Sequence, residues 1–161
     1  MVSRALLLTL ILPLGLSPSP AACAASPATA EAADLANAGR YEEAAARFSQ
    51  AISEDPRNPR LHLSLGLVYQ SLQRYEEAMR SLEAAARLAP SLPEAYYSLA
   101  LLYEAVAVDP GMLKSKPEPA AYWRKAKGAW SHYLRLAKDA AGRETAQKHL
   151  QRVSEEVETA R

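Results

Sequence analysis

The side chains best suited to acid–base or metal chemistry in this sequence are its three histidines. His62, His132 and His149 lie far apart along the chain, and none has a partner at metal-ligand spacing. We predict that His62 packs in an aromatic slot and that His132 and His149 are surface residues. No metal site and no cofactor are predicted.

Two pairs of adjacent residues invite a catalytic interpretation but are badly placed for it. Ser131 and His132 are neighbours, and adjacent side chains on a helix point away from each other. Lys127-Gly128 lacks the upstream glycine that would let backbone amides wrap a phosphate. The sequence therefore predicts a protein that is not an enzyme.

Basic residues are concentrated in the C-terminal third of the chain. Residues 25–110 carry 7 basic and 12 acidic groups, whereas residues 111–161 carry 11 basic and 6 acidic groups. Two interpretations stay open. The basic run is either a solvated face that balances the acidic part, or a contact for an anionic surface or an acidic partner. The residues of that contact would be Lys114, Lys116, Arg124, Lys125 and Lys127.

An internal repeat indicates which elements position these side chains. The sequence Arg-Tyr-Glu-Glu-Ala at 40–44 recurs unchanged at 74–78, an offset of 34 residues, and the same offset relates Pro56 to Pro90. The adjacent acids of this motif fall where helices are expected to begin, and carboxylates stabilise the helix dipole there. A period of this length is typical of stacked helix pairs.

The repeated residues resemble the tetratricopeptide repeat. The best match is residues 59–92, which supply Leu65, Gly66 and Tyr69 on a first helix and Tyr75, Ala78, Leu82, Ala85 and Pro90 on a second. The resemblance implies an all-α fold, a right-handed superhelix of antiparallel helix pairs. It divides the chain into repeats 25–58, 59–92 and 93–138, with a loop inserted at 108–121, and a capping helix over 139–161.

We expect helices near 26–38, 41–54, 60–72, 75–88, 93–107, 120–137 and 141–159. The first has Glu31 where the repeat pattern has leucine, so we expect it to be short or frayed. The last carries one apolar stripe, made by Ala146, Leu150, Val153 and Val157, as expected of a helix that caps a stack.

The resemblance also implies where a partner binds. In such repeats the first helix of each pair lines the concave face. The residues that would point to this face are Arg60, Leu63, Leu67 and Gln70 in one repeat and Glu94, Tyr97, Leu101 and Glu104 in the next. The apolar members Leu63, Leu67, Tyr97 and Leu101 are called the apolar strip below. Either the strip receives an apolar or helical segment of a partner, or the first helix or neighbouring helices cover it. The clamp that some such repeats use for a terminal carboxylate needs Lys, Arg and Asn at these positions, and it is missing.

The N-terminus has the layout of a secretory signal, predicted over residues 1–24. One positive charge at Arg4 is followed by an apolar run over 5–16 and small residues over 17–25. The apolar run has about a dozen residues, short of the roughly 20 that a transmembrane helix needs. Cys23 is either the lipidated residue of a lipoprotein or a residue lost on ordinary cleavage.

Together these features predict an exported chain, periplasmic or anchored as a lipoprotein. We expect a non-enzymatic scaffold of the bacterial cell envelope that binds a protein or peptide. It should contact membrane only through a lipid anchor. No nucleic acid partner is predicted, because 18 basic and 18 acidic residues remain once the segment containing Arg4 is removed. The alternative is a homo-oligomeric structural repeat protein.

Overall fold

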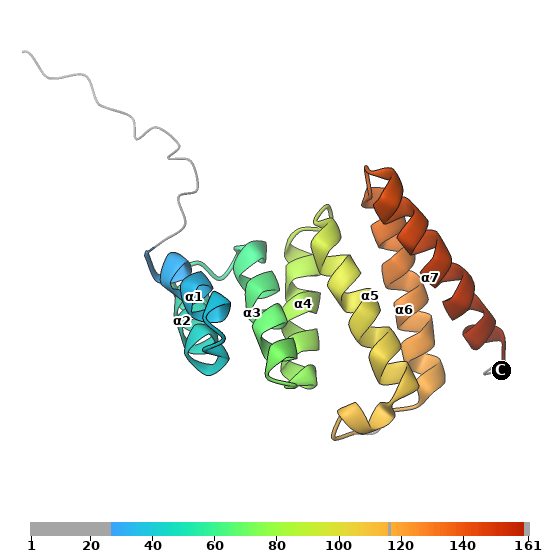
Figure 1. Cartoon of the computed structure of the whole chain (residues 1–161), viewed down its shortest axis with the longest axis horizontal. Helices are drawn as coiled ribbons and strands as arrows, with labels where there is room; N and C mark the ends of the chain where they lie inside the picture. Colours follow the sequence, from blue (N-terminus) through green and yellow to red (C-terminus); the bar gives the residue numbers. More distant parts are fainter. Residues whose placement is uncertain (1–26, 116, 160–161) are drawn as a thin grey trace, which may run out of the picture.

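The described part of the chain folds into a row of seven α-helices, which stand side by side (Figure 1). The computed structural model describes residues 27–115 and 117–159, and these contain no strand. The helices are α1 Pro27–Asn37, α2 Tyr41–Glu54, α3 Pro59–Ser71, α4 Tyr75–Leu88, α5 Pro93–Val108, α6 Pro119–Leu136 and α7 Ala140–Thr159. Each begins and ends within one residue of its predicted limits. The all-α prediction is confirmed.

The first helices of the pairs start at prolines, as does α6. Pro59, Pro93 and Pro119 each occupy the first helical turn, where the missing N–H costs nothing. At α3, the side chain of Asn58 adds a cap, since its Oδ1 accepts a hydrogen bond from the backbone N–H of Arg60 at 3.1 Å. These local signals favour helix starts at the predicted positions.

The repeated Arg-Tyr-Glu-Glu-Ala motif opens both α2 and α4 in the same way. Arg40 pairs with Glu43 at 2.6 Å, and Arg74 pairs with Glu77 at 2.6 Å. The hydrogen bond from Arg74 lowers the pKa of the Glu77 carboxyl. The adjacent acids therefore lie in the first turns of α2 and α4, as the sequence predicts.

Gly66 sets how closely α3 approaches α4. A Cβ added there would lie 2.7 Å from Cγ of Leu82, a side chain that is fully buried, and 3.3 Å from the carbonyl oxygen of Ala78. Gly128, on α6, is helical too, but a Cβ there would meet nothing within 4 Å. The two glycines provide a matched pair, one at a close contact and one in open space.

Gly66→Ala is expected to lower the free energy of unfolding by about 1–2 kcal/mol, because steric strain exceeds the gain in helix propensity. Gly128→Ala is expected to raise it by about 0.5–1 kcal/mol through propensity alone. Urea denaturation of both variants measures the difference. A stabilised Gly66→Ala variant would mean that α3 and α4 do not meet at this glycine.

The buried side chains form two clusters. The smaller lies among α1, α2 and α3 and contains Ala32, Ala44, Ala45, Phe48, Ala51, Leu61, Leu65 and Val68. The larger is built from α4 to α7 and includes both tryptophans, Trp123 and Trp130, with Leu63 and Tyr69 of α3 packed against it. Helix α3 thus contacts both clusters and joins them.

The segment between α5 and α6, predicted as an inserted loop, takes part in the core. It contains a short 3-10 helix, η1 Pro110–Met112, and then Leu113, which is 2% exposed and belongs to the larger cluster. The backbone N–H of Lys114 donates to Oε1 of Glu76 on α4 at 2.6 Å. The segment is therefore anchored by one buried leucine and one hydrogen bond to α4.

Both terminal helices match their sequence expectations. Helix α1 is the shortest of the seven, and Glu31 lies exposed on it, paired with Arg47 of α2 at 3.2 Å. On α7, Ala146 and Val153 are fully buried, and Leu150 and Val157 pack against the larger cluster. The predicted stripe of α7 thus faces the core.

Candidate functional site

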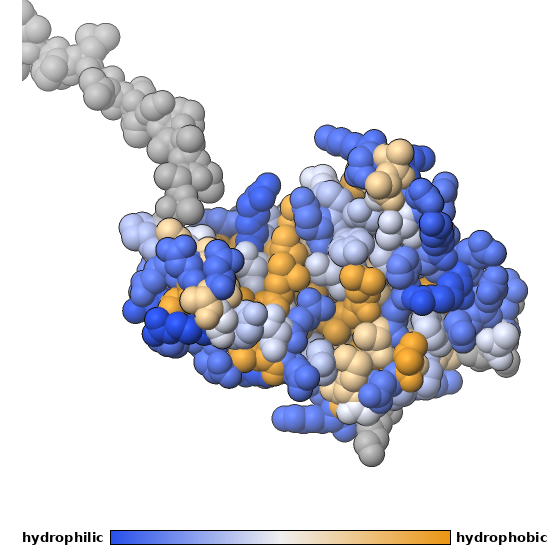
Figure 2. Space-filling model, in the orientation of Figure 1, coloured by the Kyte–Doolittle hydropathy of each residue, from blue (hydrophilic) through white to orange (hydrophobic). Residues whose placement is uncertain are grey.

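The apolar strip lies on α3 and α5, and most of it is exposed. Leu67, Tyr97 and Leu101 are 44%, 37% and 36% exposed, respectively. Leu63 is half-buried against the larger cluster, so it contributes more to packing than to the surface. Figure 2 shows hydrophobic side chains gathered around α3 and α4 and again over α5, with polar residues around them. The alternative left open by the sequence, in which the first helix or neighbouring helices cover the whole strip, does not hold for these three side chains.

One exposed apolar residue near the strip was missed by the sequence analysis. Val108, the last residue of α5, is 74% exposed. It follows Leu101 by 7 residues and Tyr97 by 11, so it lies on the same helical face. The spacing is visible in the sequence, but Val108 had been assigned to the inserted segment.

The polar residues predicted beside the strip have mixed placements. Arg60 and Glu94 are exposed at the starts of α3 and α5, and Gln70 is half-buried near the end of α3. Glu104 is 5% exposed, and its carboxylate is occupied from within the chain. The prediction that Glu104 faces a partner is therefore wrong.

Glu104 holds three side chains of the C-terminal helices. Its Oε1 accepts a hydrogen bond from Nε1 of Trp130 at 2.6 Å and lies 3.0 Å from Nδ1 of His149, while Oε2 pairs with the guanidinium of Arg152. The imidazole of His149 also stacks on the Trp130 ring, with centroids 4.3 Å apart. The prediction that His149 is only a surface residue is wrong as well, because α7 lies over this part of α5.

The other two histidines make simpler contacts. His62 is half-buried, with Nε2 3.0 Å from the backbone oxygen of Pro56. His132 is exposed on α6, and its ring stacks on Tyr96 with centroids 4.8 Å apart. Across residues 27–115 and 117–159, no three His, Cys, Asp or Glu side chains come together as a metal site.

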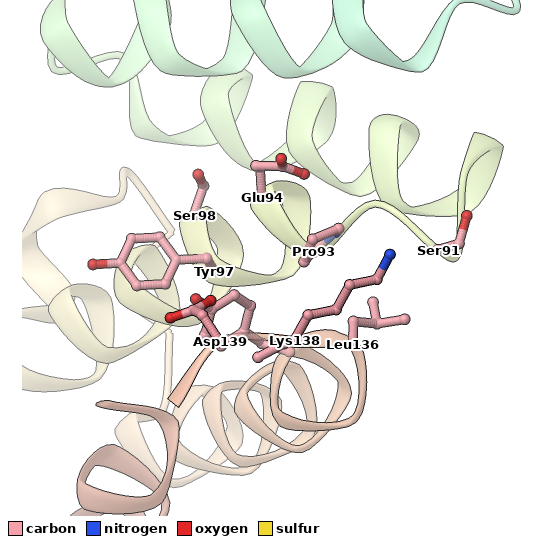
Figure 3. Close-up of a pocket in the computed structure, with 10 residues that line it drawn as sticks. Ser91, Pro93, Glu94, Tyr97, Ser98, Leu136, Lys138 and Asp139 are labelled. Carbon is pink, nitrogen blue, oxygen red and sulfur yellow. The ribbon is translucent and has the colours of Figure 1, made fainter. Parts of the chain in front are cut away.

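A pocket of about 710 Å³ adjoins the strip at Tyr97. It lies where the start of α5 meets the end of α6 and the connection to α7 (Figure 3). Its lining residues are Ser91, Pro93, Glu94, Tyr97, Ser98, Tyr133, Leu136, Ala137, Lys138 and Asp139. The Tyr97 ring contacts the ring of Tyr133 at a centroid distance of 5.3 Å, so the two rings form one aromatic wall.

The predicted basic contact is only partly free in the structure. Lys125 lies 3.9 Å from Glu83 and over the rings of Tyr103 and Tyr122, at 5.3 and 5.0 Å. These contacts hold Lys125 against the body of the molecule. The other described members, Lys114, Arg124 and Lys127, have exposed side chains. Lys116 lies outside the described residues.

Two further predictions also fall outside the described residues: the secretory signal over 1–24 and the lipidation of Cys23. Among the helices that are described, none is both long and apolar enough to span a bilayer.

Comparison with known proteins found one family that matches part of the chain and several solved structures with a similar fold. Residues 35–102 match the tetratricopeptide repeat family. No curated protein matches the chain. Among solved structures, the first TPR of Spaghetti (RPAP3) bound to an HSP90 peptide has a TM-score of 0.63 at 19% identity, covering 81% of this chain and 92% of that one.

Two further solved structures are similar. The second TPR domain of human RPAP3, in complex with an HSP70 peptide, has a TM-score of 0.61 at 19% identity and covers 79% of this chain and 92% of that chain. The type III secretion chaperone SycD of Yersinia enterocolitica, with a peptide of the translocator YopD, has a TM-score of 0.58 at 19% identity, covering 79% and 89%. Residues 35–102 therefore match the model of the tetratricopeptide repeat, and the described helices together have a fold like that of the tetratricopeptide domains of RPAP3.

Proposed function

We propose that this chain is a non-enzymatic scaffold that binds a segment of another protein along the apolar strip. The segment would lie in the groove that the first helices of the pairs line on the concave face. The observation that carries the proposal is the exposure of Leu67, Tyr97 and Leu101 on α3 and α5, beside a pocket of about 710 Å³. Large apolar side chains exposed in line on adjacent helices are typical of a surface that a partner covers. An apolar or helical segment suits this surface.

The similar structures support the proposal that a peptide segment is the partner. RPAP3 and SycD are both described with bound peptides, on folds that resemble this one. The partner proposed here differs from a peptide held by its terminal carboxylate, because the Lys, Arg and Asn of that clamp are missing. Arg60 and Gln70 border the strip on α3 and would contribute polar contacts at its edge.

Leu67→Ser and Leu101→Ser are each expected to weaken partner binding about tenfold or more, since each removes an apolar anchor from the contact. The wild-type chain is first used to capture its partner from bacterial envelope extract, and the affinity of each variant is then measured by titration. Leucines are preferred here to Tyr97, which also packs on Trp130 at 5.6 Å and would confuse binding with folding.

Leu88→Ser is the matched control. Leu88 is 37% exposed, close to the 36% of Leu101, but it ends α4 and lies off the strip. This variant is expected to bind like the wild type. Equal losses in all three variants, or none in any, would contradict the proposal. Light scattering at micromolar concentration tests the homo-oligomer alternative, which a monomer would contradict.

We also propose that the chain is exported and acts in the cell envelope, on the basis of its first 24 residues. If Cys23 is lipidated, cells grown with labelled palmitate are expected to label the protein, and Cys23→Ser is expected to abolish the label. Label that persists in the Cys23→Ser variant would contradict lipidation at this residue.

A further inference from the structure

The pocket extends the apolar strip, because Tyr97 belongs to both. A side chain of a segment bound along the strip could therefore enter the pocket at this end. Three separate stretches of chain form it, namely the start of α5, the end of α6 and the connection to α7, so its walls are held by packed helices (Figure 3). The character of these walls indicates which side chain fits.

The charged groups of the pocket do not neutralise one another. Glu94, Lys138 and Asp139 all line it, and none of them has an ion pair among residues 27–115 and 117–159. Oδ1 of Asp139 accepts the backbone N–H of Gly142 at 2.7 Å, which holds this carboxylate at the start of α7. In Figure 3 the Lys138 side chain extends away from Asp139, toward Ser91. The pocket lining therefore carries two carboxylates and one ammonium group, an excess of one negative charge.

The apolar part of the pocket is suited to a long side chain. Tyr97 and Tyr133 supply ring faces, and Leu136 adds an aliphatic surface. Burial raises the pKa of the Tyr133 hydroxyl, and the negative charges of Asp139 and Glu94 raise it further. Glu94 and Asp139 thus line the same pocket as these rings.

Only one class of side chain uses all of these groups. Lysine and arginine have aliphatic stems that pack on apolar walls, and their cationic ends bind both carboxylates and aromatic faces. An acidic side chain would meet two like charges, and a purely apolar one would cover carboxylates without pairing them. We propose that the pocket is a subsite for a lysine or arginine side chain of the segment bound along the apolar strip. This inference rests on the proposed function.

The test uses peptides, because the natural partner is not identified. A displayed library of random peptides is selected on the full chain, and winners that lose binding to Leu101→Ser are synthesised. These winners are expected to share one basic position. Replacing that residue with norleucine, which keeps the stem and removes the charge, is expected to weaken binding about fivefold, the effect of a part-exposed cation beside rings and acids.

Variants of the chain then locate the effect. Glu94→Gln and Asp139→Asn are expected to weaken the basic peptide about threefold each and to leave the norleucine peptide unchanged. Lys138→Gln is expected to strengthen binding of the basic peptide, because it removes a like charge. Glu54→Gln changes an exposed acid far along the chain, at the end of α2, and is expected to have no effect.

The outcomes separate this inference from the proposed function. Failure to select any peptide that depends on Leu101 would contradict both. Peptides that depend on Leu101 but share no basic residue, or whose basic residue is insensitive to Glu94→Gln and Asp139→Asn, would overturn the subsite alone. Weaker binding to Lys138→Gln would also overturn it, because this result assigns the pocket to an acidic group.

Discussion

Trp130→Ala is expected to lower the free energy of unfolding by about 3–5 kcal/mol, the usual cost of removing a large aromatic ring from a core. The Trp130 side chain is fully buried. It contacts the rings of Tyr97 at 5.6 Å and Tyr133 at 5.9 Å, and it lies under the imidazole of His149. Its removal opens a cavity among α5, α6 and α7. Urea denaturation followed by circular dichroism measures the loss.

Trp130→Phe is the control for this prediction. Phenylalanine keeps most of the packing but cannot donate to Glu104, so a loss of about 1–3 kcal/mol is expected from the missing hydrogen bond to this buried carboxylate, whose Oε1 keeps only the contact with His149. A loss below 1 kcal/mol for Trp130→Ala would mean that α7 does not close over this ring.

Glu104→Ala is expected to cost about 2–3 kcal/mol. The variant leaves the buried N–H of Trp130 without its acceptor, and it removes the carboxylate that His149 and Arg152 share. Because both partners on α7 are lost, amide hydrogen exchange is expected to accelerate in α7 before it does so in α3 or α4.

Arg152→Ala separates the buried contact from the exposed one. The Arg152 side chain is 58% exposed, so its ion pair is expected to contribute less than 1 kcal/mol. If Arg152→Ala were as damaging as Glu104→Ala, the ion pair and not the Trp130 hydrogen bond would be the main contact of Glu104.

The helix limits could be predicted because local chemistry sets them. Prolines open α3, α5 and α6, and the repeated motif opens α2 and α4, so sequence spacing translates directly into helix starts. The face of α3 and α5 that carries Leu67 and Leu101 was also predicted, since position in the repeat determines it, whereas the sequence left open whether these side chains are exposed or covered. Both inferences needed only a period and a helical face.

The features that were missed depend on where distant segments meet. The repeat pattern assigns Glu104 to the concave face, where a partner would meet it, but His149 and Arg152 of α7 lie against it. The period of the repeat does not say where the final helix packs. Leu113 was read as loop because no helical spacing includes it, although its side chain fills the larger cluster. The pocket combines Glu94 with Asp139, 45 positions later, at a junction set by the α6–α7 connection.

The division of the buried residues into two clusters has a consequence for cooperativity. The smaller cluster has 8 buried residues, whereas the larger has 19 and contains both tryptophans, so the end formed by α1 and α2 opens at a lower energetic cost than the rest. A segment lying across both α3 and α5 would bridge the two clusters. Binding of this segment would then make two loosely coupled units unfold as one. The local stability of α1 and α2 would therefore rise when a site several helices away is occupied.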